Sequence, residues 1–463
     1  TDETRYNIAP TTATQHRYYA YYNMEIHLEA RTYTPSVTFK KVYDNSFYGE
    51  EETGSFYGVE ISSTDDKGNL GYSSIEEVKG KLEAAIAAGG ADVPNAMSKL
   101  LYVDMGSKME GTYASNNDSW NALKNALAKN AMIFLPKNTT HDDDNFAYAE
   151  EGGSFRASRN IILTDKQPFY SPYKIRVDAA NYARYIREVT GTNKQVRKST
   201  LMLPFALKLV EGNKFICKGA TDACSFDVYV MQPENCLTVS AEQKPGYDFT
   251  KFDGDVHFIP AEGESTEANK PYLIEVDEGY TPADGQSFVV FQYGAEIMPS
   301  VEHLNKSFIV GDIAEGHAKE TTYRFEHRGT YCGSKFTQVF YFANNKYFSS
   351  LNLPKEPKEV KVRPFRSCYS FTSTSGAKML SFDIVFGANN PTTGINDVKA
   401  NADLAVTAGN GAITFYAKKP QRVEVFSVNG VCIAKMNLKA NETKSVPVAA
   451  GVYVVNGVKV SVQ

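Results

Sequence analysis

Short stretches in which apolar and polar residues alternate run through most of the chain, and the alternation is clearest at its end. Val452 to Val455 and Val458 to Val462 flank the dipeptide Asn456-Gly457. Asn and Gly tolerate the positive φ angles that both central residues of a tight type I′ turn require. The second stretch places valines on one face and polar residues on the other, the period of a half-buried strand. The pattern predicts a terminal β-hairpin that packs one face on a core.

The residues before this hairpin supply the rest of a small domain. Short runs rich in Val, Ile and Phe follow one another, separated by turn signals such as Gly409-Asn410-Gly411 and Asn429-Gly430. About six or seven such strands form a small β-sandwich of the immunoglobulin-like (Ig-like) kind. The segment 386–403 is rich in Gly, Asn, Pro and Thr, as linkers are. We therefore predict a separate C-terminal Ig-like β-sandwich over residues 394–463.

Two helices are expected to interrupt the β pattern nearer the N-terminus. Ser73 and Glu76 have the spacing of a capping box, and apolar residues then recur at helical spacing until Gly89-Gly90. Asn117-Asp118-Ser119 precedes a second amphipathic stretch that begins at Trp120. Both helices are predicted to pack on a sheet.

Length and composition indicate a mainly β protein with several domains. At 463 residues the chain is too long for a single hydrophobic core. It contains 29 Tyr and 27 Phe but a single Trp, a bias that fits strands better than helix bundles. We expect a mainly β fold built from β-sandwich modules: an N-terminal α+β region over residues 1–190, a β-rich domain over 198–388, and the terminal sandwich.

Charge and hydropathy narrow the classes of partner. The net charge of −5 and a pI near 5.9, without a basic stripe, predict no nucleic-acid partner. No apolar run approaches the roughly 18 to 20 residues of a membrane span, so no transmembrane segment is predicted. The chain begins with Thr1 rather than Met, which fits an export signal already removed.

Tyrosines near the N-terminus are candidates for ligand binding. They could stack on a sugar or a peptide, whereas packing in a sheet is the commoner role of Tyr in strands and is the interpretation we favour. The candidates are Tyr18, Tyr19, Tyr21 and Tyr22.

An acidic run is the candidate metal site. Asp142, Asp143 and Asp144 could hold a hard cation such as Ca²⁺ through carboxylate oxygens. The run lacks the glycine at EF-hand spacing, so a solvated acidic loop is the favoured interpretation. We predict no cofactor.

The sequence contains no complete catalytic motif. The two-histidine helical motif of metalloproteases and the G-x-S-x-G elbow are both absent. Cys332-Gly333-Ser334-Lys335 has three residues in common with the nucleophile segment of papain-like proteases, but no histidine follows it in the chain. The six cysteines include no C-x-x-C pair, and Cys217, Cys224 and Cys236 could be bridged or free thiols. A non-enzymatic protein is therefore expected.

Several short runs follow one another in the chain in this order: LLYVDMG, KNAMIFLPKNTT, NIILTDKQPFYSPYKIRVDAANYARYIRE, STLMLPFALKL, ANKPYLIEV, VRPFRSCYSF, TTGIND and AAGVYVVNGVKVSV. Their order resembles the carboxy-terminal half of large secreted and cell-surface proteins of gut and oral Bacteroidetes-type bacteria, which often carry leucine-rich or Ig-like repeats upstream. The resemblance covers about residues 100 to 463. From about Thr393 the chain is also similar to the sorting domain of the type IX secretion system.

The resemblance implies a secreted or outer-membrane-surface location and a role in adhesion, with the export machinery as partner of the C-terminal domain. It brings no catalytic residues. We therefore expect an exported, non-enzymatic adhesion or interaction protein whose partner is a host protein or a glycan. A carbohydrate-binding surface protein and a secreted hydrolase with an unrecognised active site remain as alternatives.

Overall fold

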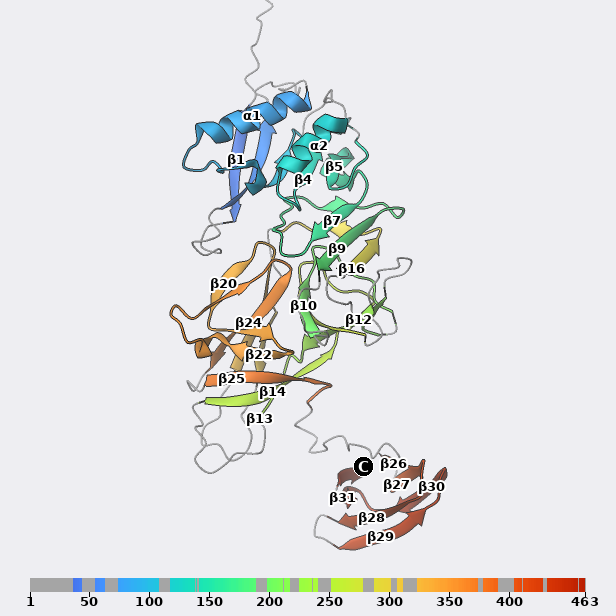
Figure 1. Cartoon of the computed structure of the whole chain (residues 1–463). Helices are drawn as coiled ribbons and strands as arrows, with labels where there is room; N and C mark the ends of the chain where they lie inside the picture. Colours follow the sequence, from blue (N-terminus) through green and yellow to red (C-terminus); the bar gives the residue numbers. More distant parts are fainter. Residues whose placement is uncertain are drawn as a thin grey trace, which may run out of the picture.

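The protein is described here from a computed structural model of the whole chain (Figure 1). The structure describes residues 36–43, 55–62, 74–107, 117–137, 139, 141–188, 198–210, 212–216, 225–234, 236–239, 251–277, 287–300, 306–310, 323–373, 378–389, 404–409, 411–427, 431–456 and 458–462.

Strands dominate the described residues, which confirms the predicted mainly β fold. They form several sheets, and the two α-helices both lie near the N-terminus, as expected. Within the described ranges, no helix is both long and apolar enough to cross a membrane.

An eight-stranded sheet forms the N-terminal part of the molecule. Strands β2, β3, β4 and β5 run parallel to one another, and β3 is buried along its whole length, as expected for a sheet covered on both faces. The strands, in sheet order, are β1 (Ser36–Tyr43), β2 (Phe56–Ser62), β3 (Leu100–Asp104), β4 (Met132–Leu135), β5 (Phe146–Ala149), β6 (Phe155–Ala157), β8 (Ile175–Arg176) and β17 (Glu296–Ile297).

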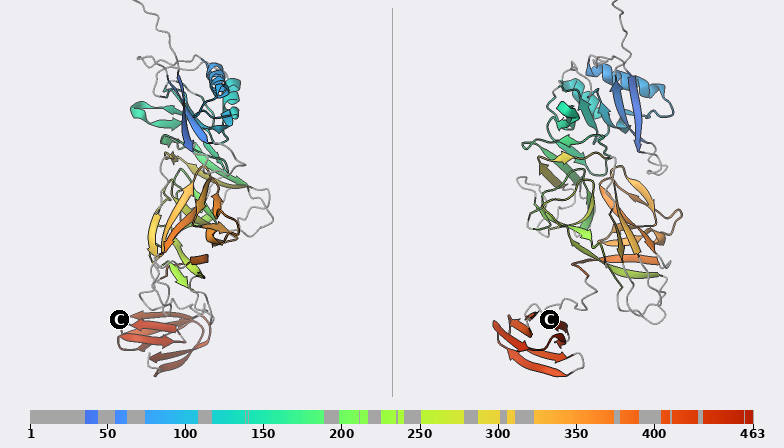
Figure 2. Two further views of the ribbon diagram at one scale, coloured as in Figure 1. Left: turned by 90° about the vertical axis from the view of Figure 1, so that its left-hand side faces the viewer. Right: turned by 180° about the vertical axis from the view of Figure 1, so that it is seen from behind.

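Helices α1 (Ile75–Ala88) and α2 (Asn117–Ala126) follow β2 and β3 and cover the same face of this sheet (Figure 2, left). Ser74 caps α1, because its side chain accepts a hydrogen bond from the backbone N–H of Glu77 at 3.2 Å. The predicted cap, Ser73, is therefore wrong by one residue. Gly89 ends the helix with a positive φ of 70°, which glycine adopts more readily than other residues. A single-turn 3₁₀ helix, Met97–Lys99, leads into β3.

A small three-stranded sheet follows the N-terminal sheet. Its central strand β9 (Tyr182–Glu188) pairs antiparallel with β16 (Ser287–Tyr293) and parallel with β7 (Ile161–Thr164). Strand β16 is an edge of this sheet. In the N-terminal sheet, a 3₁₀ turn, Glu151–Gly153, connects β5 to β6.

A twelve-stranded sheet makes up most of the centre of the chain and curls on itself. Strands at its two ends approach one another, so the apolar faces enclose a shared core rich in aromatic residues, including Phe258, Tyr323 and Tyr369. Its strands are β10 (Lys198–Met202), β11 (Lys214–Ile216), β12 (Ser225–Met231), β13 (Leu237–Val239), β14 (Lys251–Pro260), β15 (Pro271–Val276), β18 (Lys306–Val310), β19 (Tyr323–Thr330), β21 (Val339–Ala343), β22 (Lys346–Ser349), β24 (Arg366–Ser373) and β25 (Lys378–Phe386).

A two-stranded antiparallel sheet, made of β20 (Ser334–Thr337) and β23 (Glu359–Val362), packs over a small cluster that contains Val339 and Cys368. A 3₁₀ turn, Ser350–Asn352, follows β22.

One hydrophobic core crosses the boundary expected near residues 190–198. It contains Tyr102 of the N-terminal sheet, Tyr185 of β9, Leu201 of β10 and Phe365 just before β24. Strand β17, which lies far along the chain, also completes the N-terminal sheet by pairing with β8. The regions on the two sides of this boundary are thus joined by a shared sheet and a shared core.

The last described residues form two facing sheets with a core of their own. One sheet has the order β26-β27-β30 and the other β29-β28-β31-β32, and the core cluster between them contains only residues from this segment. The strands are β26 (Leu404–Gly409), β27 (Ala412–Ala417), β28 (Gln421–Ser427), β29 (Cys432–Leu438), β30 (Glu442–Pro447), β31 (Gly451–Val455) and β32 (Val458–Val462). We call this unit the terminal sandwich.

The closing hairpin of the terminal sandwich follows the sequence pattern. Val455 pairs with Val458, Asn456 has φ of 47°, and Gly457 lies outside the described residues. Val460 and Val462 are buried, as their spacing predicts. The side chain of Asn456 also accepts a hydrogen bond from the Glu424 backbone N–H at 2.7 Å, which fastens the turn to β28.

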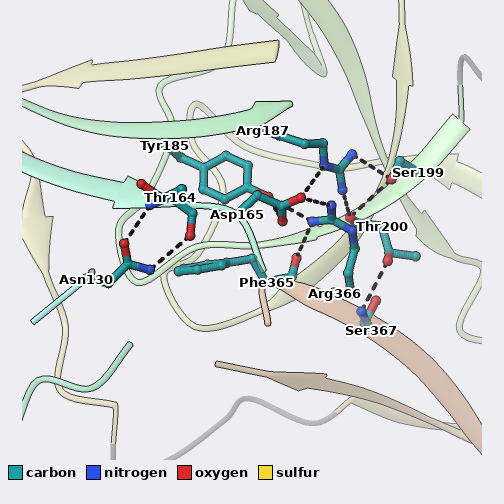
Figure 3. Close-up of polar contacts among 10 residues, drawn as sticks. All are labelled: Asn130, Thr164, Asp165, Tyr185, Arg187, Ser199, Thr200, Phe365, Arg366 and Ser367. Carbon is teal, nitrogen blue, oxygen red and sulfur yellow. Dashed lines mark hydrogen bonds and ion pairs between the residues drawn. The ribbon is translucent and has the colours of Figure 1, made fainter. Parts of the chain in front are cut away.

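A buried ionic network joins the three-stranded sheet to the twelve-stranded sheet (Figure 3). Asp165 follows β7, and its carboxylate accepts a hydrogen bond from the Tyr185 hydroxyl on β9 and one from the Arg366 guanidinium on β24, both at 2.7 Å. The guanidinium of Arg187 lies 3.8 Å from the same carboxylate and donates to Ser199 of β10 at 2.8 Å. We call these residues the Asp165 network.

The Asp165 network keeps its carboxylate ionised. Burial by itself raises the pKa of Asp165, but the neighbouring Arg366 and Arg187 guanidiniums and the Tyr185 hydrogen bond outweigh burial and hold the pKa below its usual range. A lowered carboxyl pKa stabilises the fold at neutral pH, and this stabilisation is lost as the pH falls through the folded-state pKa.

Removing the charge of Asp165 should destabilise the protein strongly. Asp165→Asn leaves two largely buried guanidiniums without their anion, and we expect a loss of about 3 kcal/mol in the free energy of unfolding. Urea denaturation at pH 7 measures it. The matched control is Asp143→Asn, whose ion pair with Lys124 is about 30% exposed and should contribute less than about 1 kcal/mol. Equal losses in the two variants would contradict the assigned role.

A buried histidine adds a second pH dependence. His327 lies in β19, stacked on Tyr369 with ring centroids 4.1 Å apart, and its Nε2 is 2.8 Å from the Ser367 hydroxyl. Burial, aided by the nearby Lys270 cation, lowers the pKa of His327 to about 3. In the unfolded chain His327 therefore becomes protonated as the pH falls below about 6.5, whereas in the folded chain it stays neutral.

We expect the free energy of unfolding to fall as the pH drops below about 6.5, by about 1.4 kcal/mol per pH unit from this one group. His327→Gln keeps a hydrogen-bonding side chain but does not titrate. The parent protein should lose stability as the pH falls and the variant should not lose it through this residue, so the stability advantage of the parent should shrink at lower pH. Denaturation at several pH values between 7 and 5 measures both, and parallel stability curves would refute the assignment.

Candidate functional site

A polar hollow lies on the outer face of strands β19 and β24. It has a volume of about 470 Å³ and is lined by Arg324, Glu326, Arg328, Thr337, Gln338, Ser370, Phe371 and Thr372. We call it the arginine groove.

The period of the strand places its charged residues. Tyr323, Phe325 and His327 point inward and are buried, so the alternate residues Arg324, Glu326 and Arg328 point outward. Across the ladder, Arg324 pairs with Thr372 and Glu326 with Ser370, which places small polar side chains beside the charged ones.

The two arginines of the groove differ in their partners. Arg328 donates to one oxygen of Glu326 from Nη2 at 2.6 Å and from Nε at 3.0 Å, and the Ser370 hydroxyl donates to the same oxygen at 3.2 Å. The side chain of Arg324 is exposed and makes no hydrogen bond or ion pair with any residue that the structure describes. The three charged side chains sum to one positive charge, which Arg324 presents to solvent.

An aromatic face lies on the three-stranded sheet. Tyr293 and Tyr182 are directly opposite across β16 and β9, with ring centroids 5.5 Å apart, and Phe291 lies 5.1 Å from Tyr182. The Arg184 guanidinium lies 5.0 Å from the centre of the Phe291 ring, and its Nε has no hydrogen-bond partner among the described residues. Tyr293 is 51% exposed, so this aromatic face offers a ring to solvent.

A second hollow of about 420 Å³ begins at the end of β16. Gln292 in its wall accepts a hydrogen bond from the Lys208 backbone N–H at 2.9 Å, and Glu296 is paired with Lys174 at 2.9 Å. Gln292 alternates with Phe291 and Tyr293 along the strand, so this hollow opens on the side of β16 away from the aromatic face.

The predicted site residues have different outcomes. The tyrosines Tyr18, Tyr19, Tyr21 and Tyr22 lie outside the described residues, and their role stays a prediction. Asp143 pairs with Lys124 at 3.1 Å, and Asp144 accepts a hydrogen bond from the Asn160 side chain at 3.0 Å, while Asp142 is exposed. In the described part of the chain no three Asp, Glu, His or Cys side chains gather closely enough to hold a metal ion.

Three of the four described thiols are buried, and burial makes them unreactive, whereas Cys432 is free and exposed. Cys332, Cys368 and Cys236 are free and buried, and burial raises the pKa of Cys332 to about 11 and that of Cys368 to about 12. Only the thiolate is a strong nucleophile, so these side chains remain in the unreactive thiol form at neutral pH. Cys217 and Cys224 lie outside the described residues.

Sequence reasoning did not find the arginine groove or the aromatic face. The alternating charges of Arg324, Glu326 and Arg328 were a visible signal for one polar strand face, but its partner strand follows about forty residues later. The aromatic face joins residues more than a hundred positions apart, and no local pattern links Tyr182 to Tyr293.

Comparison with known proteins adds no identification. A scan of protein-family models gave no match to this chain, and a search of curated proteins found no relative.

Proposed function

We propose that the chain is an exported, non-enzymatic protein of the bacterial cell surface that acts in adhesion or a related interaction. The body upstream of residue 390 carries the binding surfaces, and the terminal sandwich serves the export machinery. The observation that carries the proposal is the separate core of the terminal sandwich, because a sorting module must fold without the cargo that precedes it.

The strand order of the terminal sandwich supports its assignment as Ig-like. Its first, second and fifth strands share one sheet, while the fourth, third, sixth and seventh share the other. This is the Greek-key arrangement of Ig-like sandwiches in which the fourth strand pairs with the third. Together with the similarity of residues from about 393 onward to type IX sorting domains, this order favours an export role.

Carbohydrate binding is the second candidate, and the aromatic face favours it. Flat rings on a rigid sheet are suited to stack on sugar rings, and Tyr293 is held in place by Tyr182 through an edge-on contact of 75°. No observation among the described residues favours the third alternative, a secreted hydrolase.

Deleting residues 394–463 should abolish surface delivery of the chain. Cell fractionation of a strain that expresses the full or the shortened chain, followed by immunoblotting, measures its location. We expect the shortened chain to remain inside the outer membrane, because the body alone lacks the sorting module. A body deletion of similar size that leaves 394–463 intact is the control, and unchanged export of the shortened chain would end the sorting role.

Tyr293→Ala should weaken binding to any glycan that the body recognises, since it removes the most exposed ring of the aromatic face. We expect the full chain to bind a subset of the glycans on an array and this variant to lose about tenfold or more of the signal, which corresponds to about 1.4 kcal/mol of binding free energy. Tyr416→Ala removes another exposed tyrosine, on the terminal sandwich, and should change nothing. A blank array would remove this candidate.

A further inference from the structure

We infer that the arginine groove binds the carboxylate of an acidic sugar. The inference deepens the proposed function, on whose binding role it rests, by naming a ligand class for the body. Arg324 is the group that would hold the carboxylate, and the polar residues around it would hold the sugar hydroxyls.

The charge of the groove selects a single negative charge. Glu326 already neutralises Arg328 and fixes its guanidinium through two hydrogen bonds to one oxygen. One guanidinium, that of Arg324, remains without a partner in the described part of the chain. A planar guanidinium matches a carboxylate in a two-point hydrogen bond, whereas a doubly charged phosphate would be left half neutralised and would also approach Glu326.

The remaining lining suits a ligand with many hydroxyl groups. Thr337, Gln338 and Thr372 are exposed, and Ser370 is partly buried, so the groove presents neutral donors and acceptors around the charge. Its volume of about 470 Å³ lies within the usual range for small-ligand sites and holds one or two sugar rings.

The groove is also rigid enough to recognise a ligand. Arg324 stands on the β19–β24 ladder, whose inward face fills the aromatic core with Phe325 and Tyr369. The backbone of a paired strand is already ordered, so ligand binding costs little backbone entropy. A single charged contact can then contribute to the affinity.

Binding of sodium glucuronate to the full chain tests the inference directly. Ligand-observed NMR titration at low salt should show saturable binding of glucuronate, and glucose, which has the same ring without the carboxylate, should bind at least about tenfold more weakly. Arg324→Gln should reduce glucuronate affinity about tenfold or more and make the remaining binding independent of salt.

Arg363→Gln is the matched control, because Arg363 is an exposed arginine outside the groove lining and its loss should leave the affinity unchanged. Equal binding of glucose, or an unchanged affinity in Arg324→Gln, overturns the inference. Acetate or inorganic phosphate binding as tightly as glucuronate overturns it as well, because the site would then be selective for charge alone. The melting temperatures of both variants show that the fold is retained. Export of the chain does not depend on Arg324, so failure here leaves the sorting role standing.

Discussion

A buried carboxylate held between two guanidiniums fixes the architecture of the body. Asp165 comes from the end of β7, Arg187 from β9 and Arg366 from the start of β24, so one charge cluster binds three strands of two different sheets. The three strands can shift little relative to one another, because a shift that separated the carboxylate from a guanidinium would leave a buried charge without its partner. The hydrophobic core that crosses between the same elements supplies most of the attraction, whereas the Asp165 network selects one relative arrangement of the sheets.

The arginine groove and the aromatic face both depend on that arrangement. Arg366 begins the same strand that carries Ser370 and Thr372 into the arginine groove, and Tyr185 and Arg187 belong to the strand whose opposite face carries Tyr182. A strand buried on one face by a network or a core has a fixed register, and a register shift of one residue would turn every outward side chain inward. The inner faces thus determine which side chains the outer faces can offer.

Local patterns were sufficient for much of the fold. The alternation around Asn456 placed the terminal hairpin, and the helical spacing near Val78 and Trp120 placed both helices. The cap of α1 was misplaced by one residue because Ser73 and Ser74 are chemically equivalent, and the burial of Ile75 decides the phase of the helix. The Asp165 network could not be predicted, because Arg366 lies 201 residues from Asp165 and nothing local marks them as partners. The arginine groove depends on a similar long-range pairing.

The body and the terminal sandwich therefore differ in which parts of the chain form their hydrophobic cores. In the body, the Asp165 network and the hydrophobic core both join segments that lie far apart in the sequence. The sandwich draws its core from residues 404–462, with strand pairs between neighbours such as β31 and β32. The core of the sandwich needs no residue from outside this segment, whereas the core of the body needs segments from both sides of residues 190–198. The proposed sorting role of the sandwich relies on this separate core, because a sorting module must fold without the cargo that precedes it.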